Sequence, residues 1–202
     1  IYTERGYYNT TTEQVRLYDR PVLFNQGSRL VGDTLLYNKH TGVITVRHHI
    51  FYEDKKNKIK MMGDYGQYNE LTGEALATGK ALAKNYTNGK DTLYVHADTL
   101  RLYSYNMKTD SVYRVLHGSP HVRAFRTDVQ AVCDSLVYDT KRKQMLLYKD
   151  PIVWSDQKQI VGEEINAFMN DSIIDSIYVR RQALLIEKVD STHYNQVAGL
   201  LM

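Results

Sequence analysis

The chain has 202 residues, including 17 tyrosines and only 3 prolines, and its formal net charge at pH 7 is +3. This charge is too small, without a long basic run, to predict binding to a nucleic acid backbone. One cysteine excludes an internal disulfide, and no apolar run approaches the roughly 18 residues that a transmembrane helix needs. The length is sufficient to bury a sizeable core.

Taken in chain order, most of the sequence alternates apolar and polar residues between turn formers, the pattern of half-buried strands. Residues 1–20 are largely polar, and Thr10-Thr11-Thr12 is typical of a turn or of a poorly ordered end. Strands are expected at 15–24, 29–37, 43–52, 74–84, 92–105, 111–125 and 174–186, with turns at 25–28, 38–42, 53–58 and 85–90. The alanines of 74–84 also fit a helix by propensity, but the repeat described next favours a strand.

One unit recurs along the chain at a period near thirty residues, which indicates an array of a single supersecondary unit. Its first anchor is an acidic residue that follows a small residue or cysteine, at Asp33, Asp64, Asp98, Asp134 and Glu163. Its second anchor is a small or apolar residue, at Pro21, Ile50, Ala81, Pro120, Pro151 and Ala183. The two anchors are 17 residues apart in three units, 33 to 50, 64 to 81 and 134 to 151.

The anchors also predict where the backbone bends. Proline cannot donate to a strand ladder, so its recurrence at the second anchor indicates a bulge or bend there. The apolar residues occupy odd-numbered positions up to Ala97 and even-numbered positions from Leu100, and this change predicts a corner at Ala97-Asp98 within 92–105. Positions two and four residues after each first anchor, and those at and two after each second anchor, are consistently apolar, so each set shares one sheet face. This pattern fits a closed core and an open apolar groove equally well.

Four segments carry a resemblance to a known family: GDTLLYN (32–38), CDSLVYD (133–139), LLYKDPIVWSDQKQIVGEEI (146–165) and YNQVAG (194–199). They resemble the strand starts and strand motifs of the OstA-like/LptA-like family of periplasmic lipopolysaccharide-transport proteins, over most of residues 15–202. The chain departs from the family pattern at Lys149-Asp150 and His117-Gly118-Ser119, where a Gly-Asn pair is usual. Turn geometry is therefore expected to differ at those two places.

The resemblance implies an all-β fold: an elongated, twisted, V-shaped β-jellyroll of stacked antiparallel strands, as one OstA-like domain over 1–202. It also implies a non-enzymatic bridge protein, without cofactor or metal, that shields the acyl chains of lipid A from water. The residues then expected to line the lipid-binding groove are Leu35, Tyr37, Ile50, Tyr52, Tyr68, Leu100, Leu102, Val122, Leu136, Tyr138, Val153, Ile165 and Leu185.

The resemblance further implies partners and a location. The partners are lipopolysaccharide and other transport proteins that join end to end by β-strand pairing, and the location is the periplasm. The start at Ile1 and the ending Leu201-Met202 favour a processed fragment of a longer protein, whose signal peptide is not in this chain. The alternative is a structural or interaction module that fills its interior with its own side chains and associates through its sheet edges.

Other residues suggest chemistry, and each also has a structural interpretation. His117 and His121 have a metal-ligand type of spacing, but they lie roughly 13 Å apart along a strand. Regular recurrence of the first anchors indicates a structural rather than a catalytic role. Cys133 occupies a slot held elsewhere by Gly or Ala, which favours packing over nucleophilic chemistry. Trp154 fits either a ligand contact or a packing aromatic.

Overall fold

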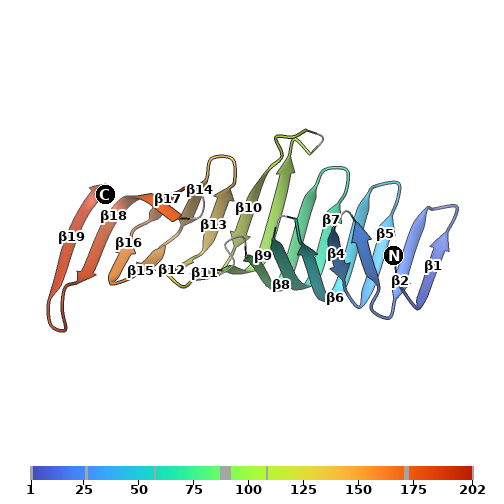
Figure 1. Cartoon of the computed structure of the whole chain (residues 1–202), viewed down its shortest axis with the longest axis horizontal. Helices are drawn as coiled ribbons and strands as arrows, with labels where there is room; N and C mark the ends of the chain where they lie inside the picture. Colours follow the sequence, from blue (N-terminus) through green and yellow to red (C-terminus); the bar gives the residue numbers. More distant parts are fainter. Residues whose placement is uncertain are drawn as a thin grey trace.

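The computed structural model describes residues 2–25, 27–56, 58–86, 92–107, 109–170 and 173–201, which form nineteen β-strands and no helix. Within these ranges there is accordingly no helix that could span a bilayer. The strands lie side by side along the long axis, from β1 (Arg5–Asn9) at one end to β19 (Tyr194–Leu201) at the other (Figure 1). The predicted fold class, an elongated all-β stack of antiparallel strands, is confirmed.

The strands form two sheets that share several long strands. The first sheet contains β1, β2 (Gln14–Tyr18), β5 (Thr34–Asn38), β10 (Tyr113–Ser119), β13 (Ser135–Asp139), β14 (Gln144–Tyr148) and β17 (Glu164–Asn170). The second contains β3 (Val22–Asn25), β4 (Ser28–Val31), β11 (Val122–Arg126), β12 (Val129–Cys133), β15 (Ile152–Ser155) and β16 (Lys158–Val161).

Five longer strands pass from one sheet into the other: β6 (Val43–Asp54), β7 (Ile59–Asn69), β8 (Glu74–Asn85), β9 (Leu93–Tyr105) and β18 (Ile173–Lys188). In β6, for example, 43–47 pair with β5 of the first sheet, whereas 51–54 pair with β4 of the second. β9 likewise pairs with β11 through 94–96 and with β10 through 99–105. The corner predicted at Ala97-Asp98 is confirmed, since β9 changes sheets there.

A row of corners joins the two sheets, and left-handed backbone makes most of the bends. Two consecutive residues have positive φ at Asp19-Arg20, His48-His49, Gly79-Lys80, Lys149-Asp150 and Arg181-Gln182. Each pair directly precedes a second anchor, and the strand register shifts at the corners within β6, β8 and β18. A left-handed residue bends a strand and re-aims its side chains. Lys149 and Asp150 therefore adopt a bend without the glycine that such φ values favour.

The expected second anchor at Pro120 is wrong by two residues. Pro21 and Pro151 are fully buried, whereas Pro120 is exposed and Val122 is only 2% exposed. Because its ring fixes φ near −65°, Pro120 cannot take the left-handed conformation, and His121 alone has positive φ at this corner. Val122 is thus the equivalent of Pro21 and Pro151, whereas the bend predicted from the prolines is present at all three.

Each acidic first anchor lies opposite the bend that precedes the next second anchor. Four of the five acids pair through their side chains with a residue of that bend. His49 Nδ1 lies 2.8 Å from Asp33 Oδ2, and His121 Nδ1 lies 2.7 Å from Asp98 Oδ2. The Lys149 ammonium lies 3.0 Å from Asp134, and Arg181 lies 3.3 Å from Glu163. These pairs are solvent-exposed and individually weak, so the recurrence of the acids reflects a structural role along the corner row.

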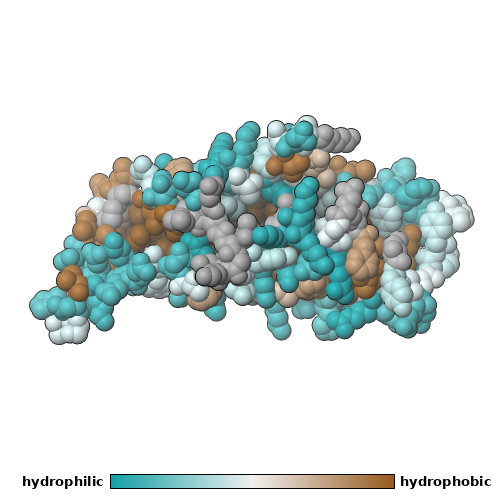
Figure 2. All heavy atoms as spheres, viewed as in Figure 1, coloured by the Kyte–Doolittle hydropathy of each residue, from teal (hydrophilic) through white to brown (hydrophobic). Residues whose placement is uncertain are grey.

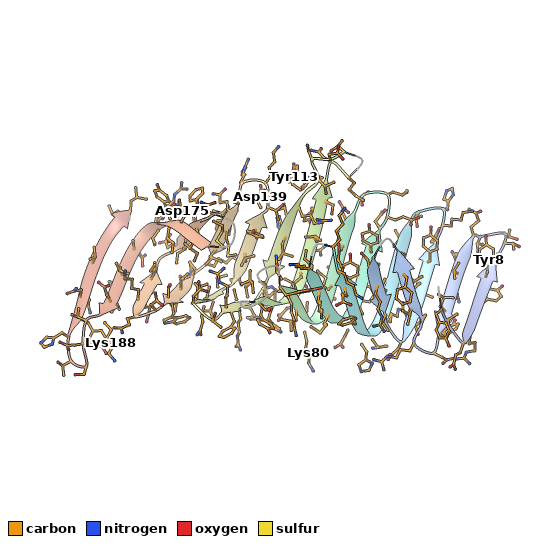
Figure 3. All side chains as sticks on the ribbon, viewed as in Figure 1. Tyr8, Lys80, Tyr113, Asp139, Asp175 and Lys188 are labelled. Carbon is orange, nitrogen blue, oxygen red and sulfur yellow. The ribbon has the colours of Figure 1, made fainter. Side chains whose placement is uncertain are left out.

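Hydrogen bonds also connect the backbone across the corners. The Asp33 amide donates to the Arg47 and His48 carbonyls, the Asp98 amide to Pro120, and the Glu163 amide to Arg181. Buried or half-buried backbone groups need such partners. Figure 3 shows the corner residue Lys80 on the lower edge of the molecule and Tyr113, Asp139 and Asp175 on the upper edge.

Several predicted boundaries need correction because the corners divide the expected strands. Residues 15–24 split into β2 and β3 at Asp19-Arg20, and residues 29–37 split into β4 and β5 at Gly32-Asp33. The strand expected at 74–84 is confirmed as β8, and Thr10-Thr11-Thr12 form a turn between two ordered strands. Of the predicted turns, position 26 in 25–28, position 57 in 53–58 and positions 87–90 in 85–90 lie outside the described residues.

Candidate functional site

The candidate site is the space between the two sheets, which apolar side chains of both sheets fill. Strand alternation aims every second residue into this space; in β11, for instance, Val122 and Ala124 are buried, whereas Arg123 and Phe125 are exposed. One core cluster runs from Met61 in β7 to Ala183 in β18, and a smaller one joins Leu17, Leu35, Val46 and Ile50 near the N-terminal end. The interior is thus apolar along most of the molecule.

Small residues keep the two sheets close in the middle of the array. The large core cluster contains Ala77, Ala81, Ala83, Ala97, Ala124, Ala131, Cys133 and Ala183. Their short side chains leave little volume between the facing sheets, and most are less than a tenth exposed. The sequence pattern was compatible with either an open groove or a closed core. In the described part of the chain the inner faces of the two sheets form a closed core.

The predicted groove residues mostly point inward, although their contact with lipid stays a prediction. Seven are buried in the core clusters: Leu35, Ile50, Leu100, Val122, Leu136, Val153 and Ile165. Tyr37, Tyr52 and Tyr138 are partly buried and pack against those clusters. Leu102 and Leu185 are partly buried, and Tyr68 is 37% exposed.

The tyrosines of this set carry their hydroxyl groups to the rim of the interior. Burial raises the pKa of Tyr52 and of Tyr138. The Tyr37 hydroxyl donates a 2.5 Å hydrogen bond to the Glu70 carboxylate, which raises the pKa of Tyr37 to about 12. Because this bond joins β5 to the β7–β8 turn, it ties neighbouring strands together at the open side of the first sheet.

A cavity of about 40 Å³ lies in the C-terminal half. Its lining is apolar apart from Arg126 and Gln130 and comprises Leu93, Ala124, Arg126, Val129, Gln130, Ala131, Met145, Leu147, Val153, Ile165, Ala167, Met169, Ile174 and Ile177. Figure 2 shows apolar surface gathered around β14 and β17, two of the strands that supply this lining. The cavity is smaller than the roughly 150 Å³ that accommodates a benzene molecule, so an acyl chain enters only if the sheets separate.

Of the predicted groove residues, only Val153 and Ile165 line this cavity, and its other lining residues were not predicted from the sequence. Met145 and Leu147 of β14 lie opposite Tyr138 and Leu136 in the strand register. The run Met-Leu-Leu-Tyr at 145–148 is apolar at every position, so its alternation does not reveal which residues face inward. The hairpin pairing with β13 could have assigned them, because residues directly opposite on paired strands share a face.

The other candidate residues have structural contacts. The ring of His117 lies edge-on to Tyr103, with centroids 5.2 Å apart, whereas His121 pairs with Asp98 at the corner. Trp154 lies on the outer face of β15 and donates from Nε1 to Gln159 Oε1 at 3.2 Å. In the part of the chain that the structure describes, no group of three His, Cys, Asp or Glu is arranged to hold a metal ion.

Comparisons with known proteins give a structural likeness only. No protein-family model matches the chain, and no curated protein sequence matches it. A solved structure that it resembles is that of LptH from Pseudomonas aeruginosa, described as the LptA-homologous periplasmic component of the lipopolysaccharide transport device. The likeness covers 85% of this chain and 94% of that one, at 12% sequence identity and a TM-score of 0.32.

Cys133 offers a test of whether the interior is closed. Its side chain belongs to the buried core, and burial raises the pKa of the thiol to about 11. This increase from the ordinary thiol pKa of 9.0 reduces the thiolate fraction about 100-fold at pH 8. We expect native protein to react with a thiol-specific disulfide reagent at least about 100-fold more slowly than protein unfolded in urea. Similar rates in both states would show that solvent reaches the interior freely.

Proposed function

We propose that this protein carries lipopolysaccharide and shields the acyl chains of lipid A between its two sheets. The observation that supports this proposal is the apolar interior, which runs through most of the strands from Leu35 to Val179. The sequence resemblance to lipopolysaccharide-transport proteins suggests this ligand and a periplasmic location. The role is non-enzymatic, and four of the five acidic anchors are engaged in pairs along the corners.

The closed interior determines how binding proceeds. Acyl chains gain roughly 25 cal/mol per Å² of apolar surface removed from water. Entry separates the two sheets, however, and gives up contacts between the inner faces, so the net gain is smaller than the gross burial. Such partial compensation makes binding reversible, which suits a carrier. A site of uniform affinity gives no direction, so partner proteins at the two ends supply it.

The filled interior also favours the second candidate function. A structural or interaction module uses its own side chains as the core and needs no ligand between its sheets. The small size of the cavity, about 40 Å³, is the specific observation that fits this alternative. The two functions differ in one measurable respect: only the carrier places lipid against inward-facing side chains.

Site-specific photo-crosslinking separates these two functions. A photoreactive residue at Val153 or Ile165, both inward-facing and along the cavity, is expected to label lipopolysaccharide. The same residue at Arg101 or Thr34, which lie on the outer face of the first sheet, is expected to give at least about tenfold less product. Gel shifts detected with an antibody against lipopolysaccharide measure the yield. Equal labelling at inward and outward positions would reject the carrier.

We propose in addition that the protein associates end to end with further transport proteins or with copies of itself. Among the described residues, β1 pairs only with β2, and β19 pairs only with β18. All eight residues of β19 are exposed, including Leu200 at 85%. An unpaired edge of this kind can accept a strand from another chain.

Proline substitutions test this association. Backbone amides of consecutive strand residues point to opposite edges, so only one of Gln196→Pro and Val197→Pro removes a donor from the free edge of β19. Native mass spectrometry is expected to show loss of higher assemblies in that variant without a fall in its melting temperature. The other variant is expected to lose stability instead, because it removes a donor to β18. Unchanged assembly in both variants would contradict end-to-end pairing through β19.

A further inference from the structure

A buried arginine lies beside the apolar cavity of the C-terminal half. Arg126 ends β11, and its side chain is only 7% exposed although it lines the cavity together with Leu93, Val129 and Met145. A guanidinium is charged at every physiological pH, and its burial is costly unless an anion compensates it. Among the described residues that line this cavity, Arg126 is the one with a charged side chain.

Asp128 supplies the compensating anion from the β11–β12 turn. Nε of Arg126 donates to Oδ1 of Asp128, and a terminal guanidinium nitrogen donates to Oδ2 at 2.8 Å. The pair is asymmetric, because the Asp128 side chain is 57% exposed. The main chain of Asp128 is held by the Ser155 hydroxyl, which donates to its carbonyl at 3.2 Å. The carboxylate can therefore rotate into solvent while the turn keeps its position.

We propose that Arg126 is the headgroup subsite of this cavity and binds the anionic group of an acyl amphiphile in exchange for the Asp128 carboxylate. The inference rests on the proposed function, since the acyl chain enters between β11 and β12 on one side and β14, β17 and β18 on the other. The fork of the guanidinium suits a carboxylate or a phosphate equally. The ligand class is thus a lipid whose headgroup carries one of these anions next to its chain.

Charge compensation makes the site selective. When one anion replaces another, Arg126 stays paired throughout, and Asp128 gains solvation as it leaves. A neutral headgroup would displace the Asp128 carboxylate without replacing its negative charge next to the buried guanidinium, which is unfavourable. Met145 and Met169 also line the cavity and, as flexible side chains, can repack around an entering chain.

Isothermal titration with three single-chain probes tests the proposal: laurate, dodecyl phosphate and dodecyl maltoside. They have chains of equal length and carboxylate, phosphate and neutral headgroups, respectively. Wild-type protein is expected to bind the two anionic probes at least about tenfold more tightly than the neutral one. Arg126→Gln is expected to abolish the preference for the anionic probes, so that all three probes bind with similar affinity.

Asp128→Asn provides the opposite change, because it removes the competing carboxylate and keeps the size of the side chain. This variant is expected to bind laurate and dodecyl phosphate severalfold more tightly than wild type. Arg123→Gln is the matched control, since Arg123 lies on the exposed face of the same strand and its loss should alter none of the affinities. Circular dichroism melts of each variant confirm that it is folded.

The outcomes distinguish this inference from the proposed function. Equal binding of all three probes to wild-type protein, or weaker anionic binding by Asp128→Asn, would overturn the headgroup subsite and leave acyl binding intact. Absence of binding by every probe would overturn both. A preference for laurate over dodecyl phosphate, or the reverse, abolished by Arg126→Gln, supports the subsite and identifies which anion it fits.

Discussion

The bend between the two sheets is the constraint on which the rest of this structure depends. At most corners two consecutive residues take left-handed backbone conformations, and the strand then continues in the other sheet. Left-handed conformations cost free energy for residues other than glycine, yet they recur at His48, His49, Lys149 and Asp150. Because each bend precedes a buried residue, the alternation on both sides of it presents apolar side chains to the same interior.

The packing of that interior follows from the geometry of the bend. Alanine and cysteine occupy inward positions at the corners, among them Ala81, Ala97, Cys133 and Ala183. Toward the open side larger residues such as Met145, Met169 and Ile177 face one another, and the cavity lies among them. A ligand therefore meets least resistance on the open side, where few contacts are lost and flexible side chains can move. The hydrogen-bonded corner can remain intact while the sheets separate.

Much of this arrangement could be predicted from the sequence, and the failures have physical reasons. The alternation and the recurring acids predicted the strands, the corner at Ala97-Asp98 and the inward direction of residues such as Leu136 and Ile165. The buried anchor after the bend at 120–121 was misplaced by two residues, because Pro120 resembles the buried anchors Pro21 and Pro151 but cannot adopt positive φ. The split of 15–24 at Asp19-Arg20 was not predicted, because arginine rarely adopts a left-handed conformation.

The candidate site was less predictable than the fold. Period-2 patterning identifies a face but carries no information about the distance between two facing sheets, so a groove and a core gave the same pattern. Met145 and Leu147 were missed because the run around them is apolar at every position. The pairing of Arg126 with Asp128 was also invisible, since an Arg-Thr-Asp turn resembles any solvated hairpin until burial of the arginine is known.

The measurement that tests the central claim most directly is the distance between the two sheets with and without lipid. In a Cys133→Ala background, nitroxide labels at Arg123 of β11 and Tyr178 of β18 lie on the outer faces of opposite sheets, on strands that border the cavity. Double electron–electron resonance is expected to show a single short distance in the free protein and a longer one, by a few ångströms, at saturating lipopolysaccharide. An unchanged distance under conditions where binding is demonstrated independently would contradict the account, because the lipid would then lie outside the interior.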